Sequence, residues 1–181
     1  MIFSYQNIKI YFCVLILGGS TLCADATLAK RDVVTVPAKA NLTLHCISTA
    51  AAAHEVPLAV LLGILATEGG RPGQALSNRN GTWDMGPFQV NTCHVEQLLK
   101  HGIRPEDVLA DACVNADAAA WLLRQEMIRS QDIWEAIGAY HSRTEHYHLA
   151  YIQRVKTNLA KLQQGRVSAL IDYANGGRRS W

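Results

Sequence analysis

Hydrophobic positions recur along most of the chain with the spacing of an α-helix. The segment 57–68 is apolar on nearly every face, which indicates a buried helix, and Pro57 can open it. No stretch shows the alternation of a strand, and residues 69–84 are expected to form a polar loop. The pattern predicts an all-α fold with one domain over residues 41–165, in which helices cover 41–55, 57–68, 94–101, 111–130, 133–142 and 145–164 and a first helical turn covers 105–107.

The two ends of the chain depart from this pattern. Residues 10–19 form an apolar run that suits the core of a signal peptide and is short for a membrane span. Ala24-Asp25-Ala26 fits the small residues that precede a cleavage point, so we expect a signal peptide over residues 1–26 and an exported protein, with an uncleaved anchor as the alternative. Residues 27–40 are expected to form an N-terminal extension, and the Gly- and Arg-rich residues 166–181 a flexible basic tail.

Composition and charge exclude some classes of protein. The chain of 181 residues is 49% hydrophobic and 18% charged, which is typical of one globular domain. The net charge of +2 gives no sign of a nucleic-acid partner. Beyond the signal peptide, Cys46, Cys93 and Cys113 remain, and the oxidising exterior favours one disulfide and one free thiol. No short cysteine spacing supports a metal site.

Glu68 is the first candidate for chemistry. It ends the apolar segment LGILATE and is followed by Gly69 and Gly70. Apolar neighbours and the negative end of a helix both disfavour a carboxylate, so its pKa should rise and it could act as a general acid. The two glycines would let a ligand approach closely. The alternative is a solvated carboxylate at an ordinary helix end.

Two further stretches carry candidate binding residues. In WDMGPFQVN, residues 83–91, glycine allows close backbone approach and amide side chains can bond sugar hydroxyl and acetamido groups. In IGAYHSR, residues 137–143, a tyrosine after small residues can point into a cavity. The alternatives are a loop that packs its apolar side chains and a half-buried core tyrosine. The candidate substrate-binding residues are Asp84, Met85, Gly86, Phe88, Gln89, Asn91, Tyr140 and His141.

In their order along the chain, these residues resemble the lytic transglycosylase family related to goose-type lysozyme. Glu68 is similar to its catalytic acid, and residues 85–91 resemble its Gly-Leu-Met-Gln-Ile-Asn turn. Ala139-Tyr140 resembles an Ala-Tyr-Asn motif, and Asp111-Ala112-Cys113-Val114-Asn115 an Asp-Pro-Cys-x-Asn motif of the small exported members of conjugation, type IV secretion and type IV pilus systems. The resemblance covers roughly residues 44–160 and implies a lysozyme-like fold. It also implies that Cys46 pairs with Cys113 and leaves Cys93 free.

The resemblance implies a reaction on peptidoglycan. Glu68 would cleave the β-1,4 bond between N-acetylmuramic acid and N-acetylglucosamine, with a 1,6-anhydro product and without metal or cofactor. It further implies a monomer in the periplasm of a Gram-negative bacterium, with a secretion or pilus machine as partner. The chain departs from the family where Gly69 replaces a serine, Pro87-Phe88 replaces Leu-Met and His141 replaces an asparagine.

Three alternatives remain open at this point. Asp84 could activate water, which would make the protein a lysozyme-like hydrolase. His141, Glu145 and His148 share a helix face and could hold the zinc ion of an amidase or peptidase, although no His-Glu-x-x-His motif is present. The chain could also be a non-catalytic subunit that binds peptidoglycan during assembly and keeps the fold.

Overall fold

The computed structural model describes residues 11–12, 24–25, 31–130, 132–162 and 165–180. The chain divides into two units, Met1–Arg31 and Asp32–Trp181. In the first unit, strand β1 (Tyr11–Phe12) pairs antiparallel with β2 (Ala24–Asp25). The rest of the expected signal peptide, including its cleavage region at Ala26, lies outside the described residues.

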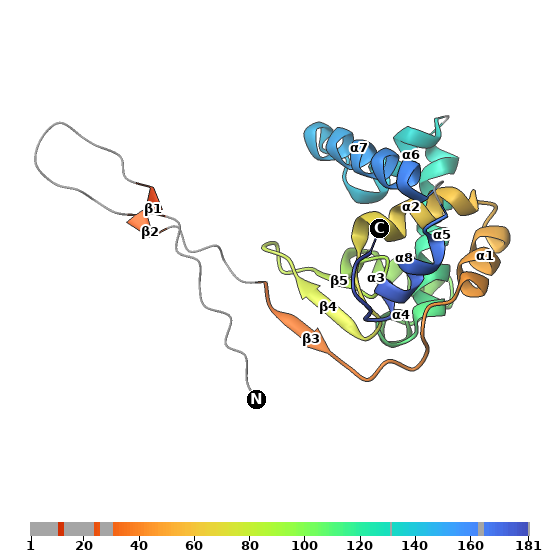
Figure 1. The fold of residues 1–181 in the computed structure, drawn as a ribbon, viewed down its shortest axis with the longest axis horizontal. Coiled ribbons are helices and arrows are strands. Elements are labelled where there is room, and N and C mark those ends of the chain that lie inside the picture. The colour runs from red at the N-terminus through yellow and green to blue at the C-terminus, as the bar shows by residue number, and fades with distance from the viewer. Residues whose placement is uncertain (1–10, 13–23, 26–30, 131, 163–164, 181) are drawn as a thin grey trace, which may run out of the picture. The chain divides into compact units, whose positions relative to one another are not determined.

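The second unit is mostly helical, as the sequence predicts (Figure 1). The predicted helices agree with the observed ones to within a few residues, and Asp132 caps α6 by accepting from the backbone N–H groups of Trp134 and Glu135. The all-α fold class is therefore confirmed. The helices are α1 (Leu44–Ala53), α2 (Leu58–Glu68), α3 (Val95–Lys100), α4 (Pro105–Ala110), α5 (Ala112–Arg129), α6 (Ile133–His141), α7 (Glu145–Leu162) and α8 (Val167–Ala174).

A small antiparallel sheet accompanies the helices, which the sequence analysis did not predict. Its strands follow the order β3 (Val33–Thr35), β4 (Gln74–Ser77), β5 (Trp83–Met85) and β6 (Val90–Asn91), and the 3-10 helix η1 (Thr92–His94) comes next. The strands have two to four residues, too few for alternation to be recognised. Residues 69–84 are thus partly strand, and the N-terminal extension 27–40 contributes β3 to the domain.

The core is built around α2. Leu61, Ile64 and Leu65 are completely buried, which confirms that this helix is surrounded by protein. Its main partner is α7, and the two approach so closely that a Cβ at Gly63 would lie 2.8 Å from the Leu159 side chain. Within the described part of the chain, no helix has both the length and the apolar character needed to cross a bilayer.

The C-terminal residues are more ordered in structure than the sequence analysis expected. Residues 166–181 were predicted to form a flexible tail, but α8 buries Leu170 and Ala174 in the core. Asn175 then fastens the helix end to Leu42 through two hydrogen bonds, both 2.8 Å long. The prediction is wrong over this helix because a short apolar stripe outweighs the Gly- and Arg-rich composition that follows it.

A disulfide joins α1 to α5. It connects Cys46 with Cys113, whose Cα atoms are 5.1 Å apart and 67 positions apart in sequence, as the family resemblance implies. Cys93 is exposed and is the free cysteine among the described residues.

Removal of this disulfide should cost stability. The double substitution Cys46→Ala/Cys113→Ala should lower the free energy of unfolding by about 2 to 4 kcal/mol, because the unfolded chain regains the freedom of a long loop. Urea denaturation of the oxidised proteins measures the change. Cys93→Ser serves as the control and should leave the midpoint unchanged; an equal loss in both variants would contradict the structural role of the disulfide.

Candidate active site

Glu68 is the last residue of α2 and is half-buried. Burial is the main cause that raises the pKa of its carboxyl from 4.5 to about 7. The hydroxyl of Tyr151, a fully buried residue of α7, donates a 2.6 Å hydrogen bond to Glu68 Oε1 and lowers this pKa in part. The Arg154 charge also lowers it, while the Asp84 charge raises it. A carboxyl with this pKa exists in both protonation states near neutral pH.

Tyr151 is itself firmly placed. The His141 ring stacks on it, with centroids 4.5 Å apart and planes 3° from parallel. The Arg154 guanidinium lies over the Tyr151 ring, 5.3 Å from its centroid. Burial and the Glu68 charge hold the pKa of Tyr151 well above its usual value of 10, so the phenol remains a hydrogen-bond donor to the carboxyl.

The end of α2 meets the turn at residues 85–89 at very short range. The Gly70 N–H donates to Pro87 O at 3.2 Å. A Cβ at Gly70 would lie 2.1 Å from Gly86 O, so a larger residue would push the turn away from Glu68. In the turn, Gln89 has φ of +50° and its side-chain amide donates to Gly86 O at 2.9 Å. Glycine at position 70 therefore lets the carboxyl and the Gln89 turn share one site.

Asn115 of α5 holds this turn from the core side. Its Oδ1 accepts from the Phe88 N–H at 2.9 Å, and its Nδ2 donates to Met85 O and Val108 O at 2.9 and 3.0 Å. The side chain is completely buried, so these bonds satisfy groups that have no access to water. Gly86, at φ of +68°, leaves no room for a Cβ because it would lie 2.4 Å from Asn115 Nδ2.

Asp84 lies on β5 and is half-buried. Its Oδ1 accepts a 2.7 Å hydrogen bond from Asn91 Nδ2 of the neighbouring strand β6. The Asp84 charge raises the pKa values of Glu68 and Tyr140, so this second carboxylate lies within electrostatic reach of the first. Asn91 acts on the site through Asp84, and it also accepts from Cys93 N.

Tyr140 lies between the turn and a cavity whose lining does not include Glu68, Asp84 or Gln89. Its hydroxyl donates to Phe88 O at 3.1 Å, and its side chain lines a cavity of about 290 Å³ together with Ala139 and Arg143. Burial and the Glu68 charge raise the pKa of Tyr140 well above 10. The Tyr140 hydroxyl therefore stays protonated and can donate a hydrogen bond. It donates to Phe88 O of the turn and not to the Glu68 carboxyl.

The structure brings most of the predicted site residues together and corrects some of their roles. The side chains of Met85 and Phe88 are buried and belong to the core. His141 is exposed, and partial removal from water, aided by the Arg154 charge, lowers its pKa. Sequence analysis missed Tyr151 as the partner of Glu68 because the tyrosine lies on the buried stripe of a helix 83 positions away.

The zinc hypothesis finds no support in the described residues. His141 stacks on Tyr151, whereas His148 Nε2 lies 3.2 Å from the Glu135 carboxylate and its Nδ1 lies 3.2 Å from Ser142 O. Across the described ranges, no group of three His, Cys, Asp or Glu side chains could hold a metal ion. The shared helix face predicted for His141, Glu145 and His148 is interrupted because α6 ends at His141.

With this geometry in view, comparison with known proteins gives the family. The sequence profile of the Transglycosylase SLT domain matches residues 45–164, and the chain belongs to this family. The match includes Glu68, the 85–89 turn and Tyr151, and it ends before α8.

Individual relatives agree with this assignment. The chain is 32% identical to invasion protein IagB of Salmonella typhi over 52% of this chain and 61% of the relative. It is 32% identical to protein IpgF of Shigella flexneri over 55% of this chain and 66% of the relative. X polypeptide of Escherichia coli strain K12 is 30% identical over 46% of this chain and 55% of the relative. The chain therefore spans about three fifths of the length of these curated relatives.

Asn115→Ala should destabilise the domain and loosen the turn. The substitution leaves buried backbone groups at Met85, Phe88 and Val108 without partners, at a cost of about 3 kcal/mol in the free energy of unfolding. Asn158→Ala is a suitable control, because Asn158 is also buried but donates to the Thr67 hydroxyl and should cost about 1 kcal/mol. Chemical denaturation compares the two; equal losses would contradict the special role of Asn115.

Glu68 should make stability depend on pH. Its folded-state pKa of about 7 lies above the ordinary 4.5, so between these values the folded protein binds more protons than the unfolded chain. The free energy of unfolding should therefore fall as pH rises from 4.5 to 7, by about 3 kcal/mol from this residue. Denaturation at several pH values should show that Glu68→Gln removes this fall. The exposed-residue control Glu96→Gln should retain it, and identical pH profiles for wild type and Glu68→Gln would disprove the coupling.

Proposed function

We propose that this chain is a lytic transglycosylase that cleaves the β-1,4 bond between N-acetylmuramic acid and N-acetylglucosamine in peptidoglycan. The observation that carries the proposal is the half-buried Glu68 carboxyl, whose pKa is raised to about 7 and whose Oε1 accepts a hydrogen bond from Tyr151. Membership of the Transglycosylase SLT domain family supports this class of reaction.

The first step needs an acid. Protonated Glu68 donates its proton to the glycosidic oxygen as the bond from that oxygen to C1 of the muramic residue breaks. Positive charge develops at C1, and the newly formed Glu68 carboxylate stabilises it. Tyr151 favours this stage because its hydroxyl bonds to the ionised carboxyl and keeps it in one orientation.

The second step restores the acid without water. The Glu68 carboxylate takes the proton from the C6 hydroxyl of the same muramic residue, and that oxygen forms a bond to C1. The product is a 1,6-anhydro sugar, and Glu68 is protonated again. The same carboxyl serves both proton transfers. Because its pKa is near neutral pH, it can give a proton in the first step and accept one in the second.

Gln89, Asp84, Tyr140 and His141 are the proposed substrate contacts. The Gln89 turn is fixed by Gly86 O and Asn115, so its amide can meet an acetamido group with little loss of side-chain freedom. Tyr140 bonds to Phe88 O of the turn and lies within electrostatic reach of Glu68, so it can orient the sugar at the cut. Gly86 contributes the carbonyl that orients the Gln89 amide, and Asn91 acts by orienting Asp84.

We also propose an envelope role. The chain is an exported periplasmic protein that opens the cell wall locally for a secretion, conjugation or pilus apparatus. Support comes from the expected signal peptide and from the relative that is named an invasion protein. Peptidoglycan glycan strands are its substrate, and it acts as a monomer.

Asp84 supports a second candidate function. Its charge acts on Glu68, and a carboxylate in this position could activate water for hydrolysis, as in a lysozyme-like muramidase. The two reactions differ in their products, because hydrolysis leaves a reducing end and the internal displacement does not. A non-catalytic peptidoglycan-binding subunit would give neither product.

Digestion of purified peptidoglycan with the mature protein tests the proposal. Mass spectrometry should find muropeptides that are lighter by one water than hydrolytic products and lack a reducing end. Glu68→Gln should lower the rate by about 100-fold to 10,000-fold, since it removes the acid and keeps the shape.

The Asp84→Asn variant provides the matched control and should still give anhydro products. Reducing-end products that disappear in Asp84→Asn would establish the muramidase reaction instead. Binding without any product would contradict both enzymatic readings.

A further inference from the structure

The C-terminal helix α8, which lies beyond the family match, reaches the backbone next to Glu68. Gly69 directly follows the acid, and a Cβ built at Gly69 would lie 3.7 Å from Tyr173 Cε1 and 3.9 Å from its hydroxyl. The Tyr173 ring is therefore in van der Waals range of the position that adjoins Glu68. Since Gly69 carries no side chain, nothing at that position stands between the backbone and the ring.

Tyr173 is held there by the rest of its helix. Leu170 and Ala174 are buried in the core, and Asn175 makes its two hydrogen bonds with Leu42. Tyr173 itself is half-buried, so part of its ring remains accessible. The helix thus holds the Tyr173 ring at a fixed place, and ligand binding need not order it.

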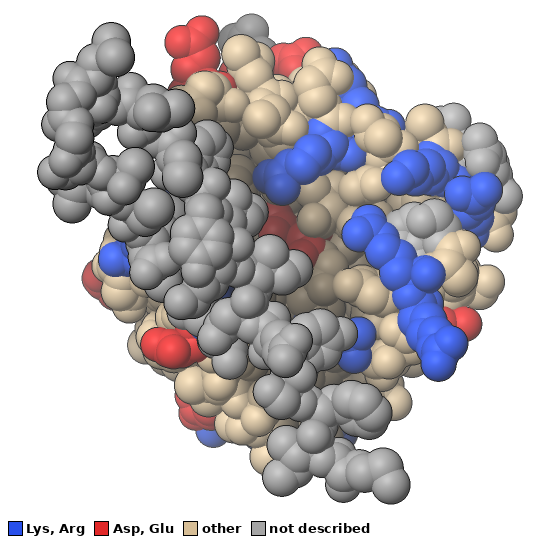
Figure 2. Space-filling view, turned by 60° about the vertical axis from the view of Figure 1, so that its left-hand side comes forward, with Lys and Arg blue, Asp and Glu red and all other residues tan. Residues whose placement is uncertain are grey.

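Two arginine side chains lie over this ring. The Arg71 guanidinium lies 5.5 Å from the ring centroid and Arg179 lies 5.9 Å from it. Arg71 also donates to Gly176 O at 3.4 Å, which ties the loop after Glu68 to the end of α8. Figure 2 shows one face of the molecule with a hollow that has acidic side chains at the bottom and several Lys and Arg side chains along its edge.

We infer that Tyr173, Arg71 and Arg179 form a sugar subsite beside Glu68 that selects an anionic muramic residue over a neutral sugar. The electron-rich face of the Tyr173 ring holds the two guanidinium groups next to the residue that follows Glu68. The guanidinium groups placed in this way can pair with a carboxylate carried by the muramic residue. The inference rests on the proposed function for its substrate, and it adds the class of residue that the site prefers.

Two sources could supply the carboxylate. Strands that carry stem peptides have carboxylates on the peptide, whereas strands stripped of peptides expose the lactyl carboxylate of muramic acid itself. N-acetylglucosamine polymers have neither. Three probes therefore separate the possibilities: intact peptidoglycan, peptidoglycan stripped by an amidase, and chitin.

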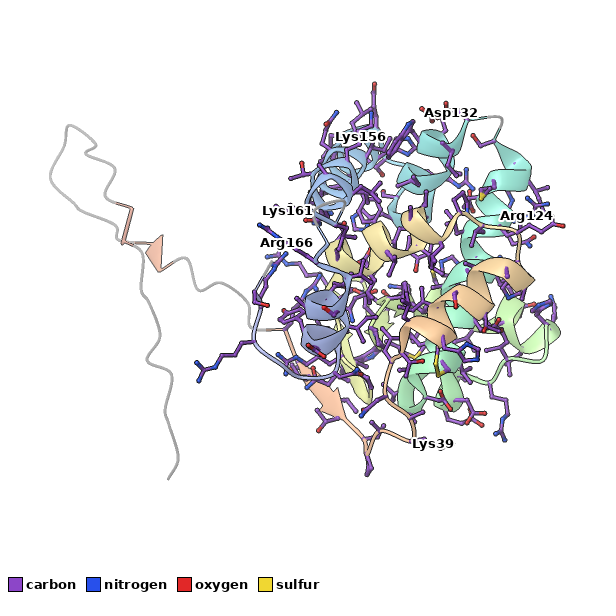
Figure 3. The ribbon with its side chains drawn as sticks, turned by 45° about the vertical axis from the view of Figure 1, so that its right-hand side comes forward. Lys39, Arg124, Asp132, Lys156, Lys161 and Arg166 are labelled. Atoms are coloured by element: carbon purple, nitrogen blue, oxygen red, sulfur yellow. A yellow bond between two sulfur atoms is a disulfide. The ribbon has the colours of Figure 1, made fainter. Side chains whose placement is uncertain are left out.

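Binding to these probes tests the subsite in the Glu68→Gln background, where cleavage does not interfere. Co-sedimentation measures it for intact peptidoglycan and chitin, and a solution binding assay measures it for the stripped strands, which are soluble because they have lost their cross-links. Adding Arg179→Gln should weaken binding to at least one anionic probe by about twofold to fivefold and leave chitin binding unchanged. Arg166→Gln is the matched control and should change nothing. Arg166 is an exposed arginine at the start of α8, where Figure 3 places it beside Lys161.

Tyr173 needs a pair of variants. Tyr173→Ala should weaken binding to both anionic probes by about threefold to tenfold, while Tyr173→Phe, which keeps the ring, should bind as before. Circular dichroism and thermal melting verify that α8 remains folded. Because the phenylalanine and Arg179 variants leave the helix core intact, the test does not depend on the alanine variant alone.

The outcomes are distinct. A loss with Arg179→Gln on intact peptidoglycan alone assigns the carboxylate to the stem peptide, and a loss on stripped strands assigns it to the lactyl group; both support the subsite. Equal losses on chitin, or the same loss with Arg166→Gln, would overturn it. An inactive wild type whose Arg179-dependent binding persists would refute the proposed cleavage and still support the subsite.

Discussion

The burial of one carboxyl at the end of an apolar helix is the constraint on which the rest of the site depends. Glu68 can remain protonated near neutral pH only while α2 is enclosed by the core, and its ionised form is stabilised by the Tyr151 hydrogen bond and by the Arg154 charge. Burial raises the pKa of Glu68, the hydrogen bond and the Arg154 charge lower it, and the resulting pKa is about 7. The fold is therefore less stable near neutral pH than it would be without this carboxyl, but the carboxyl can both give and take a proton.

The surrounding architecture keeps that carboxyl next to a binding turn. Glycines at positions 70 and 86 permit contact distances that any side chain would prevent. Asn115 fixes the 85–89 turn from the core side. The disulfide from Cys46 to Cys113 holds α1 to the start of α5, two residues before Asn115. Local strand pairing brings Asp84 and Asn91 together. Each of these features involves only a few residues, and together they position the Glu68 carboxyl and the 85–89 turn.

The sequence predicted what depends on local pattern. Helix periodicity located α2 and α7, the apolar run identified Glu68, and the family resemblance gave the cysteine pair. Strands of two to four residues carry too little pattern, so the sheet was missed, and the stripe of α8 was hidden by Gly- and Arg-rich neighbours. The Tyr151 contact could not be read from sequence, because it depends on how two helices pack. Burial likewise decided that Phe88 serves the core.

The central claim is that the Glu68 carboxyl titrates near neutral pH and that the hydrogen bond from Tyr151 lowers its pKa. Carbon-13 NMR titration of the Glu68 side-chain carboxyl, assigned by its absence in Glu68→Gln, measures this most directly. The account predicts a pKa of about 7 in the wild type and a higher value in Tyr151→Phe, because the hydrogen bond that favours the carboxylate is lost. A wild-type pKa near 4.5, or a lower value in Tyr151→Phe, would contradict it.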